Sequence, residues 1–178
     1  MYSGKQAKNK MIKRRQKISN TEVQRLREGD FVRLFTYLKK VSTLIGKKKA
    51  LEILERLAIA KRLEWLKENK DKLRLKKENL IDSIDRIFYK KFYKLDNKDR
   101  KVIKKDKFIL ITRWHNYCPV LEACKAVGLD TREICRWIYH RPNQIFLSKI
   151  NPGLTFKRNY KSIRPHADYC EEIIRLKK

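Results

Sequence analysis

The sequence has few residues that break regular structure. Only 5 of its 178 residues are glycine and 4 are proline, a composition typical of long helices and strands rather than of loop-rich scaffolds. Apolar residues make up 42% of the chain, enough to build a buried core. No stretch reaches the roughly 18–20 uninterrupted apolar residues of a membrane span. These absences predict a folded, loop-poor protein that has no membrane partner.

An apolar signal-peptide core is also missing after the charged N-terminal residues. A chain without an export signal is expected in the cytoplasm, where thiols stay reduced. We therefore expect the four cysteines to be thiols, metal ligands or redox groups rather than disulfides. The sequence contains no P-loop, no Gly-x-Gly-x-x-Gly and no His-Glu-x-x-His, so the functions tied to those motifs are not indicated.

Acidic residues are scarce relative to basic ones. The chain has 47 Lys and Arg against 20 Asp and Glu, for a net charge of +27. Such an excess repels itself unless anions lie nearby. One interpretation is a solvated lysine-rich surface, and the other is a nucleic-acid partner, RNA or DNA. Residues 1–18 are predicted to be a basic flexible tail that contacts phosphates. Its basic residues are Lys5, Lys8, Lys10, Lys13, Arg14, Arg15 and Lys17.

The pattern of apolar residues predicts an α+β fold. Spacings of three and four in the first half predict helices, and runs of β-branched and aromatic residues in the second half predict strands. We expect N-terminal helices followed by a small antiparallel sheet with inserted helices. The single domain would span residues 19–178, with a helical part at 19–95 and a cysteine-bearing part at 107–178. The expected helices cover 21–45, 47–70, 77–95, 119–128, 130–140 and 143–150. The expected strands cover 107–114, 154–160 and 169–176, and 96–106 is a charged linker or turn.

The cysteines are the candidate seat of chemistry. Their spacing lacks the Cys-x-x-Cys pairs of zinc fingers, yet a fold can gather distant cysteines around zinc or an iron–sulfur cluster. The alternative is that two or more are small buried core residues. The candidate ligands are Cys118, Cys124, Cys135 and Cys170.

Cys118 is also a candidate nucleophile. It precedes Pro119, at the predicted start of a helix, where the helix dipole and free N–H groups stabilise a thiolate. His115 is a candidate proton acceptor, and Arg113 would add positive potential. The alternative is that His115 is a surface or packing residue.

Three segments of the sequence resemble one enzyme family. The runs Arg-Trp-His-Asn-Tyr-Cys-Pro at 113–119 and Arg-Pro-His-Ala-Asp-Tyr-Cys at 164–170, with Cys135 between them, resemble the L-2-amino-thiazoline-4-carboxylic acid hydrolase family. The likeness spans about residues 33–176 and is specific from 113 onward. It implies a strand that leads into a Cys-Pro step, a second cysteine in a helix and a third in a late strand. Cys124 lies outside this pattern.

Two functions follow from these observations. The first is a thiol-centred domain that hydrolyses or binds a small ligand, or binds a metal. Cys118 would be its central thiol, Cys135 and Cys170 would line the same pocket, and Arg164 would lie nearby. As an enzyme it would open a ring at a C–N or C–S bond, as the resemblance implies. The second is a non-enzymatic nucleic-acid-binding protein, associated with RNA, ribosomes or chromatin, in which the cysteines are structural or bind metal.

Overall fold

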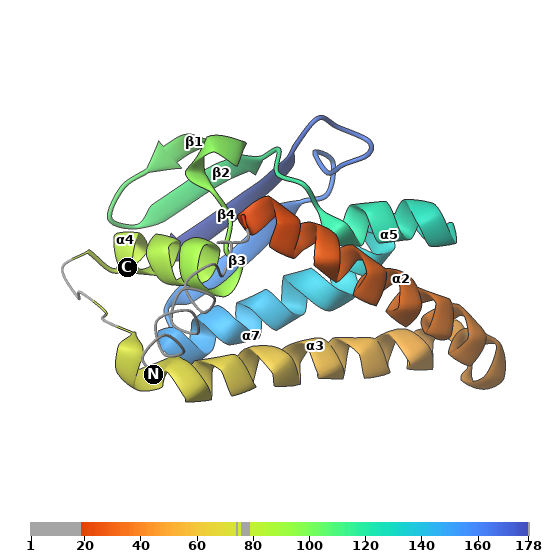
Figure 1. Cartoon of the computed structure of the whole chain (residues 1–178). Coiled ribbons are helices and arrows are strands. Elements are labelled where there is room, and N and C mark those ends of the chain that lie inside the picture. Colours follow the sequence, from red (N-terminus) through yellow and green to blue (C-terminus); the bar gives the residue numbers. More distant parts are fainter. Residues whose placement is uncertain (1–18, 74, 76–78, 178) are drawn as a thin grey trace, which may run out of the picture.

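The computed structural model describes residues 19–73, 75 and 79–177 and has the predicted α+β fold. Helices pack on one face of a four-stranded sheet (Figure 1). The strand order is β1-β2-β4-β3, and every pairing is antiparallel. No helix in the described part of the chain is long and apolar enough to cross a membrane. The lysines and arginines predicted to contact nucleic acid at 1–18 lie outside the described residues.

Two long helices form a hairpin at the start of the fold. Helix α2 (Asn20–Ile45) begins with a capping box, in which the Ser19 hydroxyl accepts the Glu22 N–H and the Glu22 carboxylate accepts the Ser19 N–H. Gly46, with φ 85°, alone separates α2 from α3 (Lys47–Asn69). Glycine adopts this positive φ without a steric penalty, so the chain reverses within one residue. A short 3₁₀ turn, η1 (Lys70–Lys72), follows α3.

The helix predicted at 77–95 is shorter than expected and largely a π-helix. Helix α4 (Leu80–Ile84) runs directly into the π-helix η3 (Asp85–Phe92). Asp85 is buried, and both Arg100 and Lys105 of the neighbouring strand pair with it, which fixes the π-helix against the sheet edge. Apolar spacing did not reveal the wider turn, because a stripe of apolar residues forms in both helix types. π-Helical segments are rare and often lie at functional sites.

The charged segment at 96–106 was predicted to be a linker or turn, and this was wrong for its second half. It contains a 3₁₀ turn, η4 (Asn97–Asp99), and the strand β1 (Arg100–Lys105). Strand β1 lies at the edge of the sheet and, among the described residues, pairs with β2 (Ile109–Trp114) alone. Because edge strands keep one side open to solvent, they accept lysines that a central strand would reject. Charged composition therefore indicated exposure and did not determine backbone conformation.

Strands β3 (Leu154–Asn159) and β4 (Cys170–Leu176) confirm the predicted antiparallel pair. Cys170 and Glu172 are both buried, on the face of β4 that the helices cover. The register places Arg158 of β3 directly opposite Glu172. The covered face of the sheet thus carries charged and thiol groups as well as apolar ones.

Helices α5 (Pro119–Val127), α6 (Thr131–Cys135) and α7 (Arg141–Ile150) connect β2 to β3, with a second π-helix, η5 (Arg136–His140), joining α6 to α7. One apolar cluster lies between the sheet, η3 and α7, and another joins α2, α3, α5 and α6. Tyr139 of η5 packs against both. The second π-helix therefore lies where the two clusters meet.

Candidate functional site

The fold brings together three cysteines that are far apart in sequence. Cys118 is the N-cap residue of α5, Cys135 ends α6 and Cys170 begins β4. Cys135 and Cys170 pack in one buried cluster with Ile163. A negative charge on Cys118 or on Cys170 would raise the pKa of the Cys135 thiol. A negative charge on Cys170 would also raise the pKa of the Cys118 thiol. Since such effects fall off with distance, Cys118 lies near this pair, and so does Cys124, whose ionisation would also raise the pKa of Cys135. Val120, two residues after Cys118, packs against the cluster.

Cys124 belongs to a different environment. It lies on α5 but packs with Phe35, Leu38 and Ile134 in the cluster between the long helices. Burial raises the pKa of its thiol to about 11, against the opposing effect of a hydrogen bond with Thr131. This is the behaviour of a small core residue.

Burial favours the protonated form of the Cys118 and Cys135 thiols. It raises the pKa of Cys118, although the Leu121 backbone N–H and the Arg164 guanidinium act in the opposite direction. Burial raises the pKa of Cys135 to about 12, against the influence of Arg158. The helix dipole and the arginines therefore reduce the cost of forming a thiolate without making the thiolate the resting form.

Two arginines lie beside the thiols. Arg158 pairs with Glu172, and its guanidinium carbon lies 3.7 Å from the centre of the Tyr139 ring. Arg164, in the loop between β3 and β4, donates from Nη1 to the Asn116 carbonyl at 2.6 Å. The Nε–H groups of both arginines are buried and have no acceptor among the described residues. Buried donors of this kind are uncommon in native proteins.

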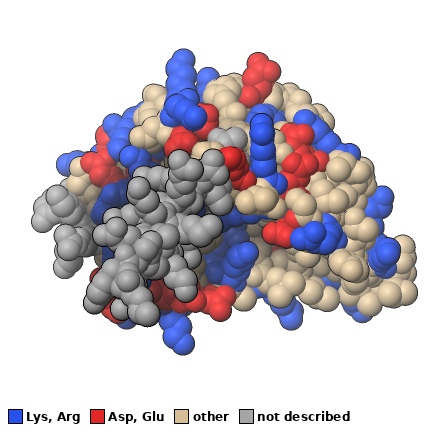
Figure 2. All heavy atoms as spheres, viewed as in Figure 1, with Lys and Arg blue, Asp and Glu red and all other residues tan. Residues whose placement is uncertain are grey.

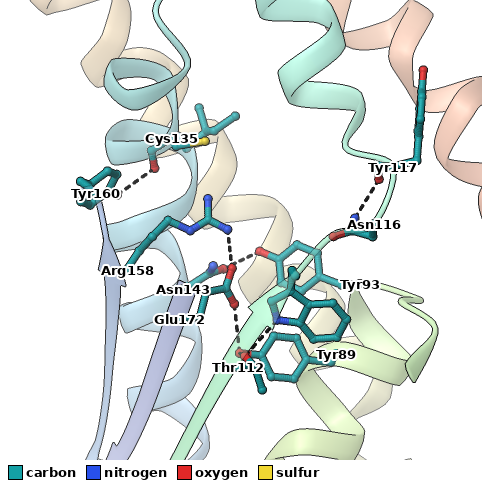
Figure 3. A network of polar contacts seen from close by, with 12 residues as sticks. Tyr89, Tyr93, Thr112, Asn116, Tyr117, Cys135, Asn143, Arg158, Tyr160 and Glu172 are labelled. Carbon is teal, nitrogen blue, oxygen red and sulfur yellow. Dashed lines mark hydrogen bonds and ion pairs between the residues drawn. The ribbon is translucent and has the colours of Figure 1, made fainter. Parts of the chain in front are cut away.

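A buried polar network extends from Arg158 into the sheet (Figure 3). The Tyr89 hydroxyl donates to Glu172 Oε2 at 3.0 Å and lies 3.3 Å from Thr112 Oγ1. The Trp114 indole N–H donates to the same Thr112 oxygen at 3.0 Å. The π-helix η3 supplies Tyr89, so its unusual backbone brings a phenol to the Glu172 carboxylate.

A second polar cluster lies on the α3 and α7 side. The Tyr93 hydroxyl donates to Asn143 Oδ1 at 2.6 Å, and Arg62 donates to the same oxygen at 2.8 Å. Tyr93 and Tyr139 have ring centres 5.3 Å apart, so this cluster continues toward Arg158 through aromatic contact. Asn143 is fully buried, and its Nδ2 has no partner within the described part of the chain.

Arg113 and His115 both contact Tyr169. The Arg113 Nε–H donates to Glu171 at 2.8 Å, and the guanidinium lies over the Tyr169 ring. Its register partner Glu171 alternates with the buried Cys170 and Glu172, so Arg113 occupies the opposite face of the sheet. His115 is exposed, and its ring contacts Tyr169. Across residues 19–73, 75 and 79–177 no interaction joins His115 to Cys118.

The arrangement of the cysteines does not form a metal site in the described residues. No group of three or more His, Cys, Asp or Glu side chains there is placed to hold a metal ion. The candidate zinc and iron–sulfur ligands thus share a region without forming a coordination shell, and Cys124 belongs to the separate helical core.

Sequence reasoning missed Arg158, Glu172, Tyr89 and Asn143. Strand alternation held a signal for the first two. Arg158 is in phase with the buried Leu154 and Phe156, and Glu172 is in phase with Cys170. When two strands each carry a charged residue at a position whose alternation points it into the core, the two residues are expected to form an internal ion pair. Tyr89 and Asn143 carried no such signal, because the π-helix and the packing of α7 determine where they point.

Comparison with known proteins identifies no relative: no family model, no curated protein and no solved structure matches this chain.

Proposed function

We propose that the chain binds a small carboxylate-containing ligand beside Cys118 and acts on it with that thiol, as its resemblance to thiazoline-carboxylate hydrolases implies. The observation that carries the proposal is the meeting of three cysteines from separate elements with two arginines whose buried Nε–H groups lack acceptors. A carboxylate supplies acceptor oxygens for such donors, and the bonds to it are charge-assisted.

Arg164 is the better placed of the two arginines to hold the carboxylate. Glu172 already neutralises Arg158, whereas the contact found for Arg164 in the described residues is with a backbone carbonyl. Arg164 also acts on the Cys118 thiol directly, because its charge lowers the pKa of that thiol. A carboxylate on Arg164 would therefore place the rest of a small ligand next to the Cys118 sulfur.

The protonated state of Cys118 suits a ligand that takes the thiol proton itself. In the proposed reaction the sulfur bonds to the ring carbon between nitrogen and sulfur, and the thiol proton moves to the ring nitrogen. The ring C–S bond then breaks as a C=N bond forms to the amino nitrogen, and the ring sulfur leaves as a thiol by taking the proton that this nitrogen gives up. Water finally cleaves the bond to Cys118 and restores the thiol. This sequence assigns no proton transfer to His115.

The test is turnover of L-2-amino-thiazoline-4-carboxylate, measured as release of ring-opened product. Cys118→Ser is expected to reduce turnover at least about hundredfold, because a serine hydroxyl is a much weaker nucleophile than a thiol. Cys124→Ala removes a cysteine from the separate helical core and should retain most of the activity. Undiminished turnover by Cys118→Ser, or neither binding nor turnover by the unaltered protein, would sink the proposal.

The net charge of +27 favours a second candidate function, nucleic-acid binding. Figure 2 shows Lys and Arg spread over much of the visible surface, with Asp and Glu among them. A surface of this kind attracts phosphates without reading bases.

Binding of a fluorescent single-stranded RNA is expected to weaken about tenfold or more between about 50 and 200 mM salt. Removing residues 1–18 should weaken it further, because that segment holds seven basic residues and no acidic one. Thiazoline turnover should be much less sensitive to both changes. A salt-independent affinity for RNA would contradict the electrostatic interpretation.

A further inference from the structure

Helix α2 exposes a stripe of large apolar residues next to its buried face. Phe35 and Leu38 lie on the buried face and pack into the core. The exposed stripe includes Leu44 at 82% and Tyr37 at 63% exposed, values unusual for large apolar side chains. Its spacing follows the helical repeat, so one side of the helix presents it. The stripe consists of Leu34, Tyr37, Val41, Leu44 and Ile45.

Helix α3 carries a matching stripe. Ile53 is 49% and Leu57 is 58% exposed, and the exposed Ala60 follows at helical spacing. Helices α2 and α3 pack against each other and are joined through Gly46. In Figure 2 the surface over the α2–α3 junction, at the right, is largely uncharged, with Lys and Arg around it. We call the two stripes together the hairpin surface. A contiguous apolar surface rimmed by charge typically marks an interaction site.

Most of the charges that flank the hairpin surface are basic. Lys49 and Arg56 lie along one side of the α3 stripe, and Lys61 lies along the other. Lys40 lies beside the stripe of α2. All four are exposed, and no acidic partner is found for them in the described part of the chain. Two carboxylates of α3 also border the stripe: Glu52 is half-buried between Lys49 and Arg56, and the exposed Glu64 follows Ala60 by one turn. The basic residues therefore outnumber the acidic ones beside the hairpin surface.

We propose that the hairpin surface binds an acidic amphipathic helix of a partner protein. A helix laid along two packed helices buries its apolar face between them. The α2 stripe spans residues 34–45, about 16 Å of helix, which matches three turns of a partner. Acidic residues on both sides of the partner's apolar face would meet Lys40, Lys49 and Arg56. Such pairs steer the encounter and select the partner.

Charge argues against the other occupants. A second copy of this chain would bring two sets of uncompensated lysines and arginines together, which like-charge repulsion opposes. An anionic lipid surface would match the charge, but helices that lie in membrane interfaces favour Trp and Phe, and Tyr37 is the single aromatic residue of the hairpin surface.

The probe is a fluorescent peptide of about 18 residues, roughly 27 Å as a helix, with leucine along one face and glutamate elsewhere. Fluorescence anisotropy should show saturable binding of this peptide. A scrambled peptide and a version with lysine in place of glutamate should bind at least tenfold more weakly. Replacing Leu44 and Leu57 together by serine, or Lys49 and Arg56 together by glutamate, should weaken binding at least tenfold.

Lys157→Glu is a control for a charge reversal elsewhere on the surface, because Lys157 is exposed on β3, away from the helical hairpin. It should bind the glutamate peptide nearly as well as the unaltered protein, and a thermal melt of each variant verifies folding. Equal binding of the scrambled peptide would overturn the proposal. So would self-association of the unaltered protein that Leu44→Ser abolishes, or binding to vesicles of phosphatidylcholine and phosphatidylglycerol that depends on Leu44 while the peptide does not bind.

Discussion

Replacing Arg158 by methionine is expected to lower the free energy of unfolding by about 3–5 kcal/mol. Methionine fills much of the same space but leaves the Glu172 carboxylate, 1% exposed, without its cation. Tyr89 would remain as a single hydroxyl donor to that carboxylate, too little to compensate a buried charge. Chemical denaturation measured by circular dichroism checks the value.

The double variant Arg158→Met with Glu172→Gln should lose less stability than Arg158→Met alone. It removes both charges, and the glutamine still accepts a hydrogen bond from Tyr89. A control on the opposite face of the same sheet is Arg113→Met, which breaks the pair with Glu171. Arg113 is 35% exposed, and partly exposed pairs contribute about 1 kcal/mol or less. Equal losses for Arg113→Met and Arg158→Met would mean that burial does not set the strength of these pairs.

Raising the pH from 8 to 11 is expected to cost about 3 kcal/mol of folding stability through Cys135 alone. Burial raises the pKa of this thiol from 9.0 to about 12. Between these two values the unfolded chain has released a proton that the folded chain retains, so stability falls as pH rises. The stability that the raised pKa of Cys135 provides is fully present below about pH 8. Burial also raises the pKa of Tyr139 and of Tyr89, which adds to the effect in the same direction.

The measurement is the slope of unfolding free energy against pH, compared between variants. Cys135→Ala should flatten the slope by the share that Cys135 contributes, whatever stability the substitution itself costs. Tyr37→Phe removes an exposed phenol and should leave the slope unchanged. The comparison between variants matters because lysines also lose charge in this range and relieve repulsion in every variant alike. An identical slope in Cys135→Ala and the unaltered protein would contradict the buried environment of this thiol.

Prediction from sequence succeeded where local pattern and exposure agree. The helix expected at 21–45 is observed as α2, and the strands expected at 154–160 and 169–176 are observed as the pair β3 and β4. Sequence-based prediction failed at β1, because an edge strand rich in lysine has the same composition as a charged linker. It also missed the π-helix η3, because an apolar stripe does not report how many residues each turn contains. That second miss concealed Tyr89, which is part of the buried network.

The sequence revealed several residues of the candidate site but did not reveal which of them lie close together. The cysteines and the Cys-Pro step were visible in the sequence, as was Arg164, but their proximity depends on contacts between α5, α6 and β4. The pairing of Cys118 with His115 rested on closeness in sequence. In the described residues His115 is exposed and contacts Tyr169, and no interaction between it and Cys118 is found.

By itself, the sequence determined the α+β class, most helix and strand positions and the strongly basic charge, because these depend on local spacing and composition. Only the tertiary structure decided which groups share one buried environment. The pairing of Arg158 with Glu172, the raised pKa of Cys135 and the exposed stripes of α2 and α3 all depend on packing between distant segments. Burial sets the energies of charges and thiols, and it is a property of the assembled fold rather than of any one stretch of chain.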